Sequence, residues 1–236
     1  MLANTKALCR TPKKAFLMIK GTNLLVGEEA LKKMKLEQFL TDYFIENDYS
    51  PVIIPSLESQ ETFVDKAGPE ILNTMYTFKD KGDRDICLIP EVTAIIQKMW
   101  KDGMYKTTKK PFKVFYLQRC YRYDRPQAGR YREFTQFGIE ILGGIPDAAK
   151  NADKEEAIFR LESCLCNTLG KRNYSINDSV KRGLSYYVED GFEAEFEGLG
   201  AQKQIAGGGR YDCGIGWAIG IERLLLAMEA IDGKSI

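Results

Sequence analysis

Apolar residues recur every three or four positions between Glu28 and Glu46, which places them along one side of a helix. Glutamates at the start of this segment suit the positive end of a helix dipole. The next segment, Tyr49 to Pro55, is short and rich in residues that favour strands. The pattern predicts a long amphipathic helix and then a short strand that ends at Pro55. Taken alone, it favours a helix whose apolar side covers its own core.

Two longer runs of aromatic and β-branched residues follow, from Phe112 to Tyr121 and from Glu133 to Leu142. Pro126 and Gly129 interrupt the segment between them, so we predict two strands joined as a hairpin. Four arginines lie on the two sides of this turn: Arg122, Arg125, Arg130 and Arg132. Because a guanidinium presents a fixed planar fork that matches phosphate oxygens, the layout is typical of a hairpin that binds phosphate.

The other segments read as shorter elements. Strands are expected at 75–78 and 85–89, and helices at 61–71, from Pro90 to about Trp100, at 153–169, and through a glycine-rich entry at Gly216 to Ala230. Strands grouped around hairpins, with helices outside them, predict an α+β fold in which an antiparallel sheet is flanked by helices. We expect an N-terminal tail at 1–20 and a single domain at 21–236.

The composition restricts the possible catalytic mechanisms more than it restricts the possible binding partners. The chain has 34 Lys and Arg against 33 Asp and Glu, so its net charge of +1 gives no overall attraction to nucleic acid or membrane. It contains no histidine, which excludes mechanisms that need an imidazole in the protein. Six scattered cysteines without a CxxC pair predict free thiols and no metal site. With no apolar leader or membrane-spanning run recognised, we expect a cytoplasmic protein.

Four stretches resemble a known family. Tyr121 to Glu140 resembles the second signature motif of class II aminoacyl-tRNA synthetases, in the histidyl-tRNA synthetase version with Arg-Pro-Gln-x-Gly-Arg-Tyr-Arg. Arg182 to Tyr187 resembles the histidine-specific Arg-Gly-Leu-Asp-Tyr-Tyr motif, and Ala206 to Asp212 resembles its companion Ala-Gly-Gly-Arg-Tyr-Asp. Gly216 to Leu224 resembles the third class II motif. The resemblance extends from about Gly21 to Glu229 and implies a mostly antiparallel sheet flanked by helices.

The resemblance also implies an ATP site. Arg122 matches the arginine that contacts the α-phosphate and the amino-acid carboxylate, and Phe134 matches the aromatic residue that stacks on adenine. Arg223 matches the arginine on the other face of adenine, and Arg130 a loop residue near the ATP tail. Arg182 matches an arginine that faces the α-phosphate in these enzymes. The implied catalytic residues are therefore Arg122 and Arg182, with ATP and Mg²⁺ as cofactors and no metal held by protein ligands alone.

A histidine pocket is implied by the same comparison. Its residues are those that match groups holding the α-amino group, the imidazole or the reacting carboxylate in the family: Glu91, Thr93, Gln136, Glu140, Arg182, Tyr186 and Tyr187. An ammonium group and a ring N–H both need acceptors of the kind that glutamate, threonine and glutamine offer. Three glycines, Gly207, Gly208 and Gly209, either bring backbone close to a ligand or form a plain tight turn.

Departures from the family pattern leave alternatives open. Ser185 stands where the family has aspartate, and the connection from Asp212 to Gly216 is short, which puts the full activity of the site in doubt. We expect neither the insertion after the second motif nor an anticodon-binding domain, so tRNA is a weakly supported partner. The resemblance implies a homodimer formed through Glu28–Pro55. The function predicted is activation of histidine with ATP, against the alternatives of a non-catalytic histidine-sensing regulator or a nucleic-acid-binding module.

Overall fold

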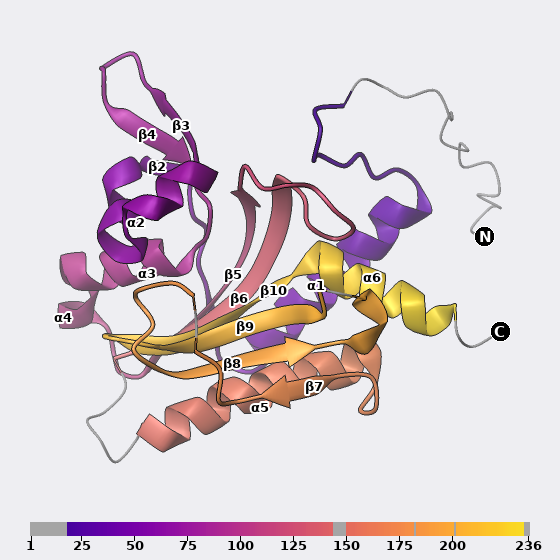
Figure 1. Cartoon of the computed structure of the whole chain (residues 1–236). Coiled ribbons are helices and arrows are strands. Elements are labelled where there is room, and N and C mark those ends of the chain that lie inside the picture. Colours follow the sequence, from indigo (N-terminus) through magenta and orange to yellow (C-terminus); the bar gives the residue numbers. More distant parts are fainter. Residues whose placement is uncertain (1–17, 144–149, 182, 201, 234–236) are drawn as a thin grey trace, which may run out of the picture.

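The computed structural model describes residues 18–143, 150–181, 183–200 and 202–233. A seven-stranded sheet, in the order β1-β5-β6-β10-β9-β8-β7, forms its centre (Figure 1). All of its neighbouring strands are antiparallel except β1 and β5. The α+β class and the mostly antiparallel sheet predicted from the sequence are therefore confirmed. The strands are β1 (Ser50–Pro51), β5 (Phe112–Tyr121), β6 (Glu133–Leu142), β7 (Ser175–Asn177), β8 (Glu189–Glu195), β9 (Gln204–Tyr211) and β10 (Gly214–Gly220).

Three helices cover one face of this sheet: α1 (Glu28–Glu46), α5 (Lys150–Leu169) and α6 (Ile221–Asp232). In α1 the buried residues Leu36, Leu40 and Phe44 repeat every four positions, as the apolar spacing predicts. They pack in one core with strand residues whose side chains point to this face of the sheet, such as Phe137 of β6 and Trp217 of β10. The helix thus buries part of its apolar side within its own chain, while Leu31, Met34 and Phe39 are exposed.

The other face of the sheet is partly covered by a smaller unit. It contains a three-stranded sheet in the order β2-β4-β3, from β2 (Leu57–Ser59), β3 (Tyr76–Lys79) and β4 (Asp85–Leu88). Its helices are α2 (Gln60–Ala67), α3 (Thr93–Met99) and the single turn α4 (Tyr105–Thr107). A second core, which includes Phe63, Ile96 and Tyr116, joins this unit to the sheet. The candidate site lies where this smaller unit meets the seven-stranded sheet.

Several predicted boundaries are wrong, for local reasons. The predicted strand Tyr49–Pro55 is reduced to Ser50–Pro51, because only this pair aligns with β5. The helix predicted to reach Ile71 ends at Ala67, where Gly68 takes a φ of 84°, and a 3₁₀ turn, Pro69–Thr74, continues the chain. The run from Gly216 is a strand as far as Gly220, so the last helix begins only at Ile221.

The helix predicted to open at Pro90 begins at Thr93. Glu91 lies before its first turn, and its carboxylate accepts a hydrogen bond from the backbone N–H of Ala94 at 3.0 Å. This bond satisfies a helix N–H that has no partner within the helix. The later start therefore leaves Glu91 in a non-helical position, close to the sheet.

Candidate functional site

Glu140 is the centre of a polar cluster on the sheet face that the second core covers. It lies in β6, opposite Gly216 of β10, and its side chain is fully buried. Gly216 is required there, because a Cβ atom at that position would lie 1.8 Å from the Glu140 Oε2 atom. The missing side chain makes room in the middle of a sheet for a carboxylate, which a strand rarely accommodates.

Both oxygens of the Glu140 carboxylate accept hydrogen bonds. The hydroxyl of Thr93 donates to Oε1 at 2.7 Å, and the hydroxyl of Tyr211 donates to Oε2 at 2.7 Å. Burial raises the pKa of Glu140 to about 8, although these two donors oppose the shift. Tyr211 belongs to the stretch Ala206–Asp212, but its role was missed in the sequence, because a tyrosine at the end of a strand resembles an ordinary core residue.

A second buried carboxylate lies beside the first. Glu91 accepts the Tyr186 hydroxyl at 3.1 Å in addition to its bond from α3. Burial raises its pKa, while the hydrogen bond from Ala94 and the positive charge of Arg122 lower it. The rings of Tyr186 and Tyr187 lie 4.6 Å apart between their centroids. The structure thus brings Glu91 and Thr93 of one segment together with Tyr186 of another.

Gln136 lies on the same face of β6 as Glu140, four residues earlier. Its Oε1 atom accepts a bond from the thiol of Cys120 at 3.3 Å. Tyr187 lies against Gly209, where a Cβ atom would be 2.9 Å from the tyrosine ring. The glycine run of β9 is therefore neither a tight turn nor a loop: Gly209 lies inside a strand and leaves space for an aromatic ring.

Arg122 follows β5, and its side chain contacts Pro90 and Phe134. Its Nε donates to the carbonyl oxygen of Pro90 at 2.8 Å, and its guanidinium carbon lies 5.2 Å from the centre of the Phe134 ring. The backbone N–H of Arg122 donates to the backbone carbonyl of Arg132 at 2.9 Å, across the hairpin. These contacts hold a cation beside Glu91 and next to a partly exposed aromatic face.

The other two arginines of the implied ATP site are engaged elsewhere. Arg130 donates to the Asp124 carboxylate at 2.8 and 3.1 Å. Arg223 donates from Nε to the carbonyl of Gln204 at 2.6 Å and from Nη2 to the carbonyl of Gln202. Burial lowers the pKa of Arg223, and the positive charge of Arg130 adds to this. The two cations therefore lie near each other, where the hairpin turn packs on α6.

A partly buried ion pair behind these residues was not expected from the sequence. Lys33 of α1 donates to Glu222 Oε1 at 2.5 Å and to the Thr135 hydroxyl at 2.6 Å, and Glu222 Oε2 accepts the N–H of Thr135 at 2.9 Å. Thr135 lies between Phe134 and Gln136, and Glu222 precedes Arg223. No sequence spacing links a lysine of the first helix to these positions. The pair connects three elements directly behind the site.

Arg182, one of the two implied catalytic residues, lies outside the described residues. Ser185, which replaces the family's aspartate, donates its hydroxyl to the carbonyl of Lys66 at 2.8 Å. The short connection after β9 is a tight hairpin in which Tyr211 pairs with Gly214 of β10. Among the residues that the structure describes, no group of three or more His, Cys, Asp or Glu side chains is arranged to hold a metal ion.

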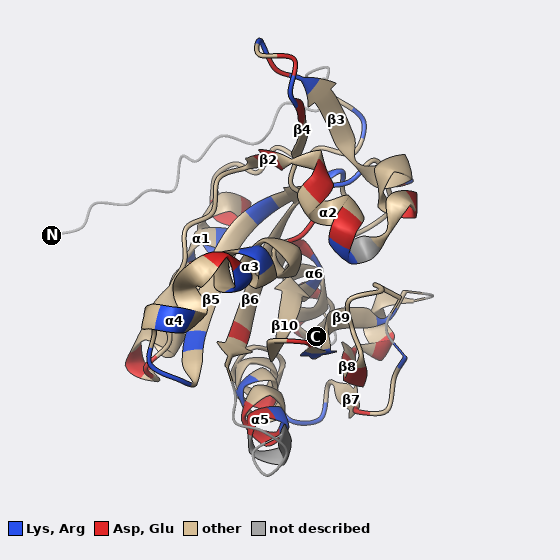
Figure 2. Ribbon diagram, turned by 90° about the vertical axis from the view of Figure 1, so that its left-hand side faces the viewer, with Lys and Arg blue, Asp and Glu red and all other residues tan. Residues whose placement is uncertain are grey.

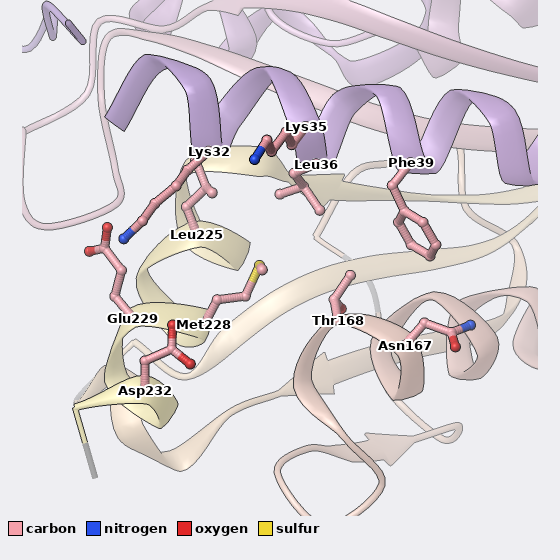
Figure 3. Close-up of a pocket in the computed structure, with 10 residues that line it drawn as sticks. All are labelled: Lys32, Lys35, Leu36, Phe39, Asn167, Thr168, Leu225, Met228, Glu229 and Asp232. Carbon is pink, nitrogen blue, oxygen red and sulfur yellow. The ribbon is translucent and has the colours of Figure 1, made fainter. Parts of the chain in front are cut away.

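A separate hollow of about 320 Å³ lies on the opposite side of the sheet, between α1, α5 and α6 (Figure 3). Its floor is apolar, with Leu36, Leu225 and Met228, and lysines of α1 face acidic residues of α6 across it. It contains none of the residues of the polar cluster. The cluster and this hollow are therefore two different features of the molecule.

Comparison with known proteins gives the family. Residues 21–158, more than half of the chain, match the family model described as histidyl-tRNA synthetase. The chain belongs to the histidyl-tRNA synthetase family. A histidine–tRNA ligase of Clostridioides difficile (strain 630) is 29% identical over an alignment that covers 89% of this chain and 74% of that protein.

Solved structures of the family and its relatives share the fold. The apo histidyl-tRNA synthetase of S. aureus is 27% identical, with a TM-score of 0.74 over 92% of this chain and 70% of that one. A Bacillus halodurans C protein described as an ATP phosphoribosyltransferase regulatory subunit/histidyl-tRNA synthetase has a TM-score of 0.70 at 16% identity, covering 92% and 83%. The second likeness shows the fold alone. The family fold thus appears in proteins whose names indicate either an enzyme or a regulator.

Proposed function

We propose that this chain activates histidine with ATP to form histidyl-adenylate and pyrophosphate. The observation that carries the proposal is the pair of buried carboxylates, Glu91 and Glu140, held by hydroxyl donors beside Arg122. Buried carboxylates are costly unless they are bonded, so a cluster of two next to a cation is typical of a binding site. Family membership supports histidine as the ligand.

The chemistry follows from the charges. The carboxylate of histidine attacks the α-phosphorus of ATP, the bond to the pyrophosphate oxygen breaks, and negative charge develops on the phosphoryl oxygens. Arg122 stabilises this charge, and Phe134 offers a face for adenine. Glu91 and Gln136 hold the ammonium group, and Glu140 accepts the ring N–H. Arg182 and Arg130 are proposed to complete the phosphate site, and Arg223 is proposed to lie on the other face of adenine. Mg²⁺ would neutralise charge along the triphosphate.

The test is ATP–pyrophosphate exchange with each of the twenty amino acids. We expect exchange with histidine and not with the others. Arg122→Gln should reduce the rate at least about 100-fold, because it removes a charge that acts in the transition state. Arg119→Gln is the matched control, since this arginine of β5 is exposed and pairs with Glu133 at 3.2 Å. Exchange with another amino acid, or an undiminished rate in Arg122→Gln, would contradict the proposal.

A regulatory, non-catalytic role is the second candidate. The arrangement of Arg223 favours it, since its guanidinium donates to two carbonyls instead of facing Phe134. The Bacillus halodurans C neighbour shows that such proteins share the fold. A chain that binds histidine but never exchanges pyrophosphate would be the regulator. If exchange is found, acylation of tRNA by the same preparation would test the further step to aminoacyl-tRNA.

A further inference from the structure

The hydroxyl of Tyr116 is buried without a partner. Tyr116 lies in the middle of β5 and is 1% exposed, and its Oη atom makes no hydrogen bond to any residue that the structure describes. Within the same part of the chain only one other buried side-chain atom of this kind is found, the Nε2 of Gln97. A buried hydroxyl without a partner is unfavourable, and a phenylalanine at this position would avoid the cost.

The position of Tyr116 explains where the hydroxyl points. Tyr116 pairs directly with Gly138 of β6, and a Cβ atom at Gly138 would lie 2.3 Å from the tyrosine oxygen. The ring therefore crosses the strand over a residue that has no side chain. Gln136 and Glu140 lie two residues to either side of Gly138, on the same face. The hydroxyl is thus placed between two residues of the proposed histidine pocket.

The charges around the hydroxyl agree with this placement. Burial raises its pKa well above the ordinary value, and the negative charges of Glu140 and Glu91 raise it further. The hydroxyl is therefore neutral at any ordinary pH and can both donate and accept one hydrogen bond. Both oxygens of Glu140 already accept bonds from Thr93 and Tyr211. No residue that the structure describes accepts the proton of Tyr116.

We propose that Tyr116 is a specificity-determining residue that donates a hydrogen bond to the side chain of the bound amino acid. This inference rests on the proposed function. A neutral imidazole has one N–H and one nitrogen that accepts. Glu140 takes the N–H, and Tyr116 donates to the other nitrogen. An amino acid without an acceptor at that place leaves the hydroxyl buried and unbonded, and is rejected for that reason.

Two tyrosines of the same cluster make a matched pair for the test. Tyr116→Phe removes a hydroxyl that is unpartnered in the free protein, so the thermal midpoint should stay the same or rise. Tyr211→Phe removes a hydroxyl that donates to Glu140, and its midpoint should fall by about 2–6 °C. The two substitutions delete the same oxygen atom. Only Tyr211→Phe should lower the stability of the free protein.

The experiment measures histidine binding by calorimetry and pyrophosphate exchange with the full chain. For Tyr116→Phe we expect the Kd and KM for histidine to rise about tenfold, equivalent to about 1.4 kcal/mol, and the KM for ATP to be unchanged. An unchanged Kd for histidine would overturn the inference. A fall in thermal midpoint would also overturn it, because the hydroxyl would then have a partner within the protein.

The outcomes separate this inference from the proposed function. A wild-type chain that binds histidine but does not catalyse exchange removes the proposed enzyme, and the Kd of Tyr116→Phe still decides the role of the hydroxyl. A wild-type chain that exchanges normally while Tyr116→Phe binds histidine equally well removes only the role of Tyr116. A wild-type chain that binds no histidine overturns both.

Discussion

Glu140 combines full burial with two strong hydrogen bonds, and these have opposite effects on its proton. Burial in a region without water favours the neutral acid, and the Thr93 and Tyr211 donors favour the carboxylate. Burial dominates, and the pKa rises from 4.5 to about 8. Between these values the folded protein holds a proton that the unfolded chain releases. The contribution of Glu140 to stability is therefore complete below about pH 4.5 and is lost as the pH rises to about 8.

We therefore predict that the free energy of unfolding depends on pH through Glu140. Relative to Glu140→Gln, the wild-type chain should lose about 1 kcal/mol of stability per pH unit between about pH 5 and pH 8, and the difference should level off above that. Urea denaturation at several pH values measures it. Glu133→Gln, an exposed change in the same strand, is the control and should leave the slope as in the wild type. If the free energy of unfolding of Glu140→Gln depended on pH as steeply as that of the wild type, Glu140 would not be the group responsible.

Single residues differ in how far the sequence could predict them. Glu91, Thr93 and Tyr186 were implied by the family resemblance, and the structure brings them together. Tyr211 and Tyr116 were not, because their roles depend on which residue faces them across a strand pair. Tyr116 is meaningful only opposite Gly138, and register is not visible in one sequence. The family resemblance implied the two carboxylates together with Thr93 and Tyr186, while the roles of the Tyr211 and Tyr116 hydroxyls required the sheet.

At the scale of elements, α1 is joined to the site by one ion pair. The side chains of Lys33 and Glu222 are 19% and 11% exposed, and they meet at 2.5 Å. Because Thr135 is bonded to both partners, the pair fixes α1, β6 and α6 relative to one another. A nearly buried charge that loses its partner is strongly destabilising. Phe134 and Arg223 are the sequence neighbours of Thr135 and Glu222, so the pair lies next to two residues of the proposed ATP site.

We predict that Lys33→Met destabilises the protein by about 2 kcal/mol, measured by urea denaturation, because Glu222 is left without its cation. Lys35→Met on the same helix is the control and should change stability by less than about 0.5 kcal/mol, since Lys35 borders the hollow between the helices. Adding Glu222→Gln to Lys33→Met should recover part of the loss. Strictly additive effects in the double variant would show that the two side chains do not act as a pair.

Long elements were predicted more accurately than short ones. The two strands of the arginine hairpin begin and end where the pattern places them, because each is ten residues long and bounded by turn residues. The strand predicted at Tyr49–Pro55 survives only as Ser50–Pro51, since its extent depends on β5, which comes much later in the chain. The helix after Pro90 starts late because Glu91 binds the first turn from outside. The first difference arises from a tertiary contact, and the second from a hydrogen bond at the end of the helix.

For the whole molecule, the distribution of charge says less about function than the arrangement of the elements does. Basic and acidic residues are interspersed over the elements in Figure 2, which agrees with the net charge of +1 and does not favour a nucleic-acid-binding module. No helix in the described part of the chain is long and apolar enough to span a membrane. The layered fold instead brings segments from both ends of the chain, Lys33 and Glu222, to one place behind the site.

The outer edge of the sheet offers a test of assembly. β1 is an edge strand, and beside it Ile53 is 96% exposed, while Met34 of α1 is 64% exposed. An apolar side chain this exposed beside an open sheet edge is typical of an interface, and Met34 adds exposed apolar surface on α1. Both residues belong to the segment Glu28–Pro55 through which the family resemblance implies a homodimer. We propose that two copies of the chain associate through this edge.

We predict that Ile53→Glu weakens the dimer at least tenfold, because it places a charge against apolar surface of the second copy. Sedimentation equilibrium of the wild type should give twice the chain mass, and the variant should shift toward the monomer. Phe78→Glu is the control: Phe78 is 45% exposed on β3 of the separate three-stranded sheet, and its substitution should leave the dimer intact. A wild-type monomer, or equal effects of the two changes, would exclude this edge as the interface. Since α1 carries Lys33, a dimer through this region would also link the site of each copy, by way of the Lys33–Glu222 pair, to the surface that the other copy covers.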